Sequence, residues 1–422
     1  MSSRPNYRYG LGVTSQFYFC SLPLRLDPYS QCSFGCRYCF AAERGGAKRG
    51  RGLQAIDVEA LRRRLSRISE GQVRTVVDEL LARGQPLHIG GMSDPLVRAE
   101  EAEGTTLRIL DLLAETGHRA VVSTKGVELL DDRYLEALVR GRFIVQISLS
   151  SVDESLMRRV DLRAPSPTRR IEAMRYLSDA GVPVSVRVQP LLPTRERDAE
   201  DVIQASAEAG ARHASFEHLK LGVESWPGTD GLSAALGLDV VADFRRRGAR
   251  RVGRKWILPV DERLPRQLHL RDCAHRSGLS FAAADNDLLL LSDGECCCSG
   301  ADLIAGFKDY YRFNYVEAVR LGLARNRISF DRLSDVWRPS ATISSHVNSR
   351  SRMPVSDGRG AGVESYIRQN WNGRPNGHSP LALWGVTETG DSDRHGLAIY
   401  ELTAEACSLY RQSQQNNSAT PV

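Results

Sequence analysis

Short apolar runs alternate with longer segments of helical periodicity from about Tyr18 to Leu221. The apolar runs predict six strands, at residues 17–26, 86–91, 119–124, 143–150, 182–189 and 213–221. The helical patterns lie at 105–115, 132–139, 167–180 and 198–209, and a glycine suited to the C-cap follows each at Gly117, Gly141, Gly181 and Gly210. Connections through helices predict a parallel sheet in an α/β fold, curved into a partial (β/α)6 barrel of the TIM type. Catalytic groups are then expected where the strands end.

The pattern changes after Leu221, where Gly, Ser, Pro and Asn become frequent and helical periodicity is clear only at 315–324. We therefore predict four segments. They are an N-terminal segment at 1–16, the β/α core at 17–222, a C-terminal region at 223–411 and a disordered polar tail at 412–422.

Composition points to a soluble protein of the cytoplasm. The chain has 422 residues, of which 41% are hydrophobic and 26% charged, and no apolar stretch reaches the roughly 18 residues of a membrane span. No apolar segment of the signal-peptide kind follows the polar N-terminus. The cysteines number nine and are clustered, which favours metal ligation in a reducing compartment over disulfides.

The net charge of +6 is concentrated in two basic runs. One contains Arg44, Lys48, Arg49 and Arg51, and the other occupies 245–255. Either run could follow the phosphates of a nucleic acid, and a solvated surface or disordered loop is the alternative.

Three cysteines directly follow the first predicted strand, with the spacing C-x3-C-x2-C at Cys32, Cys36 and Cys39. Three thiolates on one short loop can bind one metal centre, either iron-sulfur or zinc. Structural zinc needs a fourth protein ligand, and the next histidine, His88, is a whole β/α unit away. We therefore expect three protein ligands and one open coordination position, with zinc or a redox dithiol as alternatives.

This spacing resembles the signature of the radical S-adenosylmethionine (SAM) superfamily. The resemblance implies a 4Fe-4S cluster whose free iron chelates the amino and carboxylate groups of SAM. It also implies reductive cleavage to a 5′-deoxyadenosyl radical that abstracts hydrogen from a substrate, and an electron donor of the flavodoxin or ferredoxin type. Tyr38 matches an aromatic position that commonly contacts the adenine, and a packed loop aromatic is the alternative.

Later strand ends resemble those of the spore photoproduct lyase group, over about Leu26 to Leu221. The run Arg-Ala-Pro-Ser at 163–166, followed by a helix, is typical of that group. The resemblance implies SAM contacts at the strand ends. Gly90 and Gly91, with Ser93 or Asp94, would meet the amino group, Lys125 the carboxylate and Ser148 the ribose, and Arg187 is a second candidate for carboxylate or ribose or else a buried ion pair.

Met92 departs from that group, whose lyase uses a cysteine at this position as hydrogen donor. Methionine has no transferable thiol hydrogen, so the lyase reaction would need another donor, such as Cys20, Tyr310 or Tyr311.

A second group of cysteines comprises the consecutive Cys296, Cys297 and Cys298, with Cys273 upstream. Four thiols in one region predict an auxiliary iron-sulfur cluster, and redox-active or buried free cysteines are the alternative. Cys20 and Cys407 are expected to be small core residues. His88, His213 and His218 are expected to be satisfied within the fold.

Three functions remain open at this point. The first is a radical SAM enzyme that acts on a nucleic acid or a nucleotide-derived substrate. The second is a radical SAM enzyme that modifies a peptide or small metabolite with the help of an auxiliary cluster. The third is a non-catalytic, zinc-stabilised protein that binds nucleic acid.

Overall fold

A computed structural model describes residues 7, 10–43, 52–222, 229–342, 362–373 and 377–416, which form two compact units. Unit 1 takes its described residues from Met1–Leu11, Arg25–Ser66 and Leu87–Phe281, and unit 2 from Gly12–Leu24, Arg67–Pro86 and Ala282–Val422.

The strands are β1 (Leu11–Val13), β2 (Leu24–Leu26), β3 (Leu87–Ile89), β4 (Ala120–Thr124), β5 (Ile144–Ser148), β6 (Val184–Leu191), β7 (His213–His218), β8 (Leu221–Gly222), β9 (Arg250–Val252), β10 (Lys255–Ile257), β11 (Ser280–Ala283), β12 (Val386–Ser392) and β13 (Ala398–Leu402). The α-helices are α1 (Phe40–Glu43), α2 (Val58–Ser69), α3 (Val76–Ala82), α4 (Glu100–Glu103), α5 (Thr105–Glu115), α6 (Asp132–Gly141), α7 (Glu154–Val160), α8 (Pro167–Asp179), α9 (Asp198–Glu208), α10 (Thr229–Leu236), α11 (Val240–Arg246), α12 (Val260–Arg276), α13 (Ala301–Ile304), α14 (Tyr315–Gly322), α15 (Val363–Arg368) and α16 (Ala404–Asn416).

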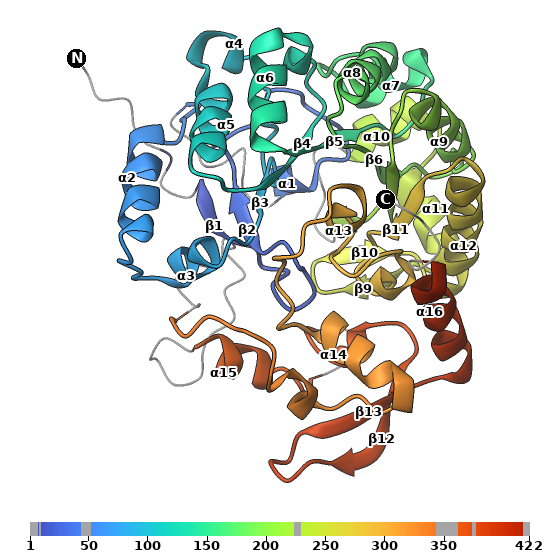
Figure 1. Ribbon diagram of the computed structural model, residues 1–422. Helices are drawn as coiled ribbons and strands as arrows, with labels where there is room; N and C mark the ends of the chain where they lie inside the picture. Colours follow the sequence, from blue (N-terminus) through green and yellow to red (C-terminus); the bar gives the residue numbers. More distant parts are fainter. Residues whose placement is uncertain are drawn as a thin grey trace. The chain divides into compact units, whose positions relative to one another are not determined.

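The main sheet has eight strands in the order β1-β2-β3-β4-β5-β6-β7-β11 (Figure 1). Strands β3 to β7 pair in parallel with their neighbours in the chain, as expected for β/α units. Every residue of β4 is buried, as are the first four of β5, because helices cover parallel sheets and exclude water from them. The predicted α/β class and partial barrel are confirmed.

The predicted helices appear as α5, α6, α8 and α9, and α5 packs beside α6 (Figure 1). Gly117, Gly181 and Gly210 have positive φ, as a C-cap requires. Gly141 is a different case, because the left-handed C-cap residue of α6 is Arg142, with φ 49°. A Cβ at Gly141 would lie 2.2 Å from the Phe143 ring, so this glycine provides space for an aromatic side chain.

The strand predicted at 17–26 is wrong over most of its length, because only β2 at its end joins the sheet and residues 15–19 form a turn. Aromatic packing within unit 2 explains the difference. Tyr18 stacks on Tyr366 with ring centroids 5.1 Å apart and on Tyr315 at 5.6 Å, while Phe17 lies 4.6 Å from Tyr311. These rings contact residues about 300 positions away, which local periodicity does not report.

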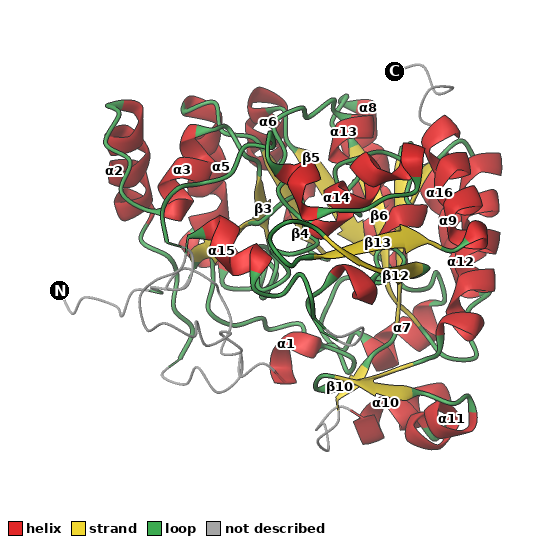
Figure 2. Ribbon diagram, turned by 90° about the horizontal axis from the view of Figure 1, so that it is seen from below, coloured by secondary structure: helices red, strands yellow, loops and turns green. Residues whose placement is uncertain are grey.

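Residues just beyond the predicted core continue unit 1. Leu221, Leu232, Val240, Phe244 and Leu258 belong to one buried cluster. Figure 2 shows α10 and α11 beside β10, which pairs antiparallel with β8 and β9. Part of the region assigned to 223–411 is therefore integral to this unit.

In unit 2, β12 and β13 form an antiparallel hairpin, and the predicted helix at 315–324 appears as α14. Helix α16 extends to Asn416, so the first residues of the predicted disordered tail are helical. The basic residues Arg44, Lys48, Arg49 and Arg51, positions 417–422 of the tail, and positions 1–6 and 8–9 of the N-terminal segment lie outside the described residues. Within the described part of the chain, no helix combines the length and apolar character that crossing a membrane requires.

Candidate active site

The loop after β2 carries Cys32, Cys36 and Cys39, and we call residues 32–39 the cysteine loop. Backbone contacts hold it against the segment that follows α7. Cys36 forms an isolated antiparallel bridge with Asp161, the Arg37 amide donates to the Val160 carbonyl at 3.0 Å, and the Arg163 amide donates to the Phe34 carbonyl at 2.9 Å. The conformation of the loop is therefore set by residues more than 120 positions later in the chain.

Asp161 lies at the centre of a buried ion network that includes Tyr38, Lys125 and Arg170. Tyr38 donates its hydroxyl hydrogen to Asp161 Oδ1 at 2.6 Å, and Lys125 Nζ donates to the Tyr38 hydroxyl at 2.9 Å. Lys125 Nζ and Arg170 Nη1 lie 3.5 and 2.9 Å from Asp161 Oδ2. The side chains of Asp161 and Arg170 are 1% and 0% exposed, so these charges are screened little by water.

The network carries one negative and two positive charges. Burial alone would raise the pKa of Asp161, but Lys125 and Arg170 lower it to about 2, so the carboxylate stays ionised at neutral pH. Burial, followed by Asp161, raises the pKa of the Cys36 thiol, whereas Lys125 lowers it. The excess positive charge beside Cys36 suits a centre that carries negative charge.

The donors of this loop fit an iron-sulfur cluster. Three sulfur atoms of one loop are soft ligands, and the pKa of Cys36 is influenced by both Cys32 and Cys39, which places the thiols near one another. No group of three ligand atoms within 4.8 Å of one another includes these cysteines among the described residues. The three sulfur atoms therefore do not all lie within 4.8 Å of one another, as three ligands of a single small ion would.

The end of β3 brings backbone close to the same region. Gly90 has φ +89°, and a Cβ there would lie 2.2 Å from the Ser123 carbonyl oxygen, so only glycine fits. The Ser93 hydroxyl donates to the Tyr29 carbonyl, which leaves its lone pairs available as acceptors. Asp94 accepts from the Thr124 hydroxyl at 2.6 Å and from the Lys125 amide at 2.7 Å, joining the ends of β3 and β4.

A chain of hydrogen bonds crosses the sheet from β3 to β6. His88 Nε2 lies 2.7 Å from Ser123 Oγ, which donates to Gln146 Oε1 at 3.0 Å, and Arg187 Nη1 donates to the same oxygen at 3.1 Å. Burial, with Arg25 and Arg187, holds the pKa of His88 well below its usual value, so its imidazole is neutral.

Arg187 also donates to Gln189, and its Nη2 lies 4.0 Å from Glu217 on β7. The ion pair considered from the sequence is therefore present. Ser148, at the end of β5, is paired in register with Arg187 on β6. His213 lies within 2.8 Å of Ser280 Oγ and is buried, as expected for a histidine satisfied within the fold.

The residues of the second cysteine group belong to different units. Cys273 lies in unit 1 on α12, where its sulfur is 3.4 Å from His269 Nε2. Cys296, Cys297 and Cys298, which we call the cysteine triplet, lie in unit 2.

Within the triplet, the sulfurs of Cys296 and Cys297 are 3.9 Å apart, and Cys297 contacts Ser299 Oγ at 3.2 Å. Burial is the largest cause that raises the pKa of Cys296, and Asp302 and Cys20 raise it further. Cys20 raises the pKa of Cys297 as well, so it lies near the triplet rather than alone in a core.

Asp161 and Arg170 were not selected from the sequence. Asp161 lies two residues before the Arg-Ala-Pro-Ser run, and Arg170 follows that run in α8. The Arg-Ala-Pro-Ser run therefore indicated the segment that contains Asp161 and Arg170. Local spacing could not predict that these two residues contact the distant Tyr38 and Lys125.

Residues 26–206 match the family model described as "Radical SAM superfamily". An uncharacterised protein of Mycobacterium tuberculosis is 28% identical over 203 residues, which cover 46% of this chain and 58% of the relative. An uncharacterised protein of Acidianus two-tailed virus is 26% identical over 121 residues, covering 27% and 40%. The chain thus matches well under two thirds of the length of these relatives.

Solved structures show weaker likeness. Spore photoproduct lyase complexed with dinucleoside spore photoproduct has a TM-score of 0.46 at 17% identity, covering 65% of this chain and 80% of that one. Streptococcus suis SuiB bound to S-adenosylmethionine has a TM-score of 0.40 at 15% identity, covering 62% and 51%. It is the family match that identifies the domain: residues 26–206 of this chain form a radical SAM domain.

Proposed function

We propose that this protein is a radical SAM enzyme in which Cys32, Cys36 and Cys39 hold a 4Fe-4S cluster and leave one iron to SAM. The observation that carries the proposal is a three-thiol loop, fixed by backbone contacts beside an ion network, inside a radical SAM domain. When bound, the cluster and SAM supply a 5′-deoxyadenosyl radical that abstracts hydrogen from the substrate. A flavodoxin or ferredoxin would provide the electron.

The ion network would orient the loop and offset its charge. Asp161 holds the Tyr38 hydroxyl and Lys125 Nζ in place, so the ring of Tyr38, which directly precedes Cys39, would be held in one orientation. Lys125 and Arg170 exceed Asp161 by one positive charge, which favours an anionic centre and the carboxylate of SAM. Lys125 Nζ donates one of its three hydrogens to Tyr38, so it can also donate to that carboxylate.

The strand ends would hold the rest of SAM. Gly90 and Gly91 would let backbone carbonyls reach the amino group, with Ser93 Oγ as a further acceptor. Ser148 and Arg187 lie side by side in the register of β5 and β6, where they would bind the ribose. Gln146, Gln189 and Glu217 hold Arg187, so the arginine is positioned before any ligand arrives.

The test is anaerobic reconstitution with iron and sulfide, followed by dithionite and SAM, with 5′-deoxyadenosine as the readout. The wild-type protein should form it, and Cys36→Ala should not. Cys407→Ala is the matched control, since Cys407 is buried in α16 of unit 2 and should retain the full rate. Full activity in Cys36→Ala would refute the assignment of the cluster ligands.

For the substrate, we propose a nucleic acid or nucleotide-derived compound. The net charge of +6 supports this, as does the resemblance of the strand-end motifs to the spore photoproduct lyase group. In the second basic run, Arg247 pairs with Glu196 and Glu262, so only part of that run can contact phosphates. Retention on DNA or RNA should weaken as salt rises, because each phosphate contact releases counterions.

A second candidate is a radical SAM enzyme of peptides or small metabolites with an auxiliary cluster at the triplet. The proximity of Cys20 to Cys296 and Cys297 favours it, since it adds a fourth thiol from unit 2 itself. Salt-insensitive binding to nucleic acid would favour this candidate. A colourless protein that contains zinc and forms no 5′-deoxyadenosine would favour the zinc-stabilised binding protein instead.

A further inference from the structure

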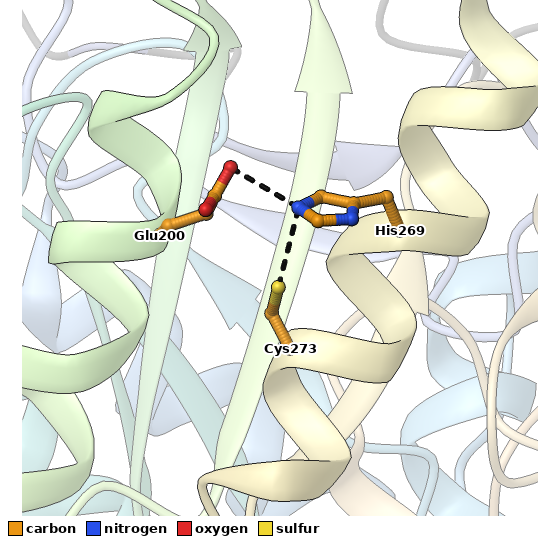
Figure 3. Close-up of side chains that lie close together, drawn as sticks. All are labelled: Glu200, His269 and Cys273. Atoms are coloured by element: carbon orange, nitrogen blue, oxygen red, sulfur yellow. Dashed lines mark hydrogen bonds and ion pairs between the residues drawn. The ribbon is translucent and has the colours of Figure 1, made fainter.

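Helices α9 and α12 of unit 1 bring together a carboxylate, an imidazole and a thiol outside the candidate active site. Glu200 comes from α9, and His269 and Cys273 lie one turn apart on α12, so both face the same neighbour (Figure 3). The three ligand atoms all lie within 4.8 Å of one another. His269 Nε2 is 3.1 Å from Glu200 Oε1 and 3.4 Å from Cys273 Sγ.

Hydrogen bonding alone accounts poorly for this arrangement. A ring nitrogen carries either one hydrogen or one lone pair, and here the same Nε2 faces both the carboxylate oxygen and the sulfur (Figure 3). If Nε2 is protonated, its single hydrogen is shared between two acceptors. If it is not, it can accept from the Cys273 thiol, but its lone pair then faces that of the carboxylate oxygen.

A tetrahedral metal ion would satisfy all three atoms together. With ordinary zinc-ligand lengths, tetrahedral angles place a nitrogen and an oxygen ligand about 3.3 Å apart, and a nitrogen and a sulfur ligand about 3.5 Å apart. The observed separations of 3.1 and 3.4 Å are within tenths of an ångström of these values. The Glu200 oxygen and the Cys273 sulfur lie within 4.8 Å of each other, against about 3.5 Å in a tetrahedron, so a bound ion would draw this pair together. Imidazole, carboxylate and thiolate together suit zinc better than calcium or magnesium.

Two arginines set the charge around the cluster. Arg266 Nη1 donates to Glu200 Oε1 at 2.9 Å, and Arg276 Nη2 donates to Cys273 Sγ at 3.2 Å. They would compensate the carboxylate and the thiolate before a metal enters, and they limit its affinity. The His269 side chain is 47% exposed, so an ion can reach the cluster from solvent.

We propose that Glu200, His269 and Cys273 form a site for a zinc-class divalent cation, with the fourth position open to water or an external ligand. The site uses no residue of the cysteine loop or of the triplet. It gives Cys273 a different role from the ligand of an auxiliary cluster that the sequence predicted. Its existence does not depend on radical chemistry.

Co²⁺ is the probe, because thiolate ligation gives a near-ultraviolet charge-transfer band and tetrahedral geometry gives intense visible bands. The parent is the full chain with Cys32→Ser, Cys36→Ser and Cys39→Ser, so that the cysteine loop does not compete. We expect saturation near one equivalent. His269→Ala in this background should weaken Co²⁺ binding at least about tenfold, since it removes a direct ligand.

The controls separate this site from the other thiols. Cys296→Ser should leave the titration unchanged, as should His395→Ala, which alters an exposed histidine of unit 2. Zn²⁺ should raise the thermal midpoint of the parent and not that of His269→Ala. The proposal is overturned if no thiolate-cobalt band saturates, if His269→Ala retains the band at full affinity, or if Cys296→Ser abolishes it.

Discussion

The cysteine loop and the cysteine triplet are two groups of thiols in different electrostatic settings. At Cys36, burial and then Asp161 raise the thiol pKa well above its usual value, and the cation Lys125 lowers it. At Cys296, burial, Asp302 and Cys20 raise the thiol pKa, and the contributions that lower it are hydrogen bonds with Cys297 and Ser299 rather than a cation. A metal must displace thiol protons at either group, and only at Cys36 does a nearby cation offset part of that cost. The contrast indicates that clustering of cysteines in sequence does not by itself define a metal site. Charged residues distant in the sequence also determine how readily the thiols lose their protons.

The largest expected difference between the two groups is in activity and iron content. Cys36→Ala should reduce 5′-deoxyadenosine formation by about a hundredfold or more, because the loop then supplies two ligands instead of three. Cys297→Ala should leave SAM cleavage within about twofold, since it lies outside the radical SAM domain. If the triplet holds an auxiliary cluster, Cys297→Ala should also lower the iron content of the reconstituted protein. Equal loss of SAM cleavage in both variants would contradict the proposal that the cysteine loop, and not the triplet, holds the cluster that cleaves SAM.

The next difference concerns the ion network, which has Asp161 as its only anion. Asp161→Asn would leave Lys125 and Arg170 buried beside each other, and should lower the free energy of unfolding by about 3 kcal/mol. It should also raise the reduction potential of the cluster, because a negative charge is lost nearby. Denaturant titration and redox titration measure the two effects.

Asp153→Asn is the matched control for Asp161→Asn. Asp153 pairs with Arg195 at the surface and caps α7, and asparagine caps helices equally well. Its effect on unfolding should stay below about 1 kcal/mol, with no change in potential. A potential unchanged in Asp161→Asn would indicate that the network supports the fold without influencing the loop.

The same comparison predicts a dependence on acid. Although burial raises the pKa of Asp161, Lys125 and Arg170 lower it from an ordinary 3.8 to about 2 in the folded protein, so its ionised form adds about 2 kcal/mol of stability above pH 4. This contribution is lost as pH falls from 4 through 2, and the curves of wild type and Asp161→Asn should converge there. The raised pKa of Cys297 keeps its thiol neutral below pH 9, so Cys297→Ser should show no such convergence. Unfolding by urea at several pH values checks this.

Local patterns predicted the parallel strands and the helices α5, α6, α8 and α9 well, because alternation and periodicity reflect burial by near neighbours. They also located the cysteines, whose chemistry depends on spacing within one loop. The sequence did not reveal the ion network, since Tyr38 and Asp161 are 123 positions apart. The predicted strand at 17–26 failed for the same reason, because Tyr18 packs on Tyr315 and Tyr366.

The smallest expected difference lies in the backbone beside each thiol group. Gly90 and Gly294 both have positive φ, so alanine costs each about 1 kcal/mol from conformation. A Cβ at Gly90 would also lie 2.2 Å from a backbone oxygen and 2.7 Å from the Pro95 ring, neither of which can move freely.

At Gly294 the nearest atoms to a Cβ are Oδ2 of Asp302 at 2.8 Å and Cγ of Leu303 at 2.9 Å. These atoms belong to side chains, which can shift more readily than backbone, although Asp302 would weaken the hydrogen bond that it accepts from the Glu295 amide. Gly90→Ala should therefore destabilise the protein by about 1.5 kcal/mol more than Gly294→Ala, as measured by urea unfolding. It should also raise the KM for SAM, whereas Gly294→Ala should not. Equal effects would mean that the close approach of backbone at β3 is a packing feature without a role in binding SAM.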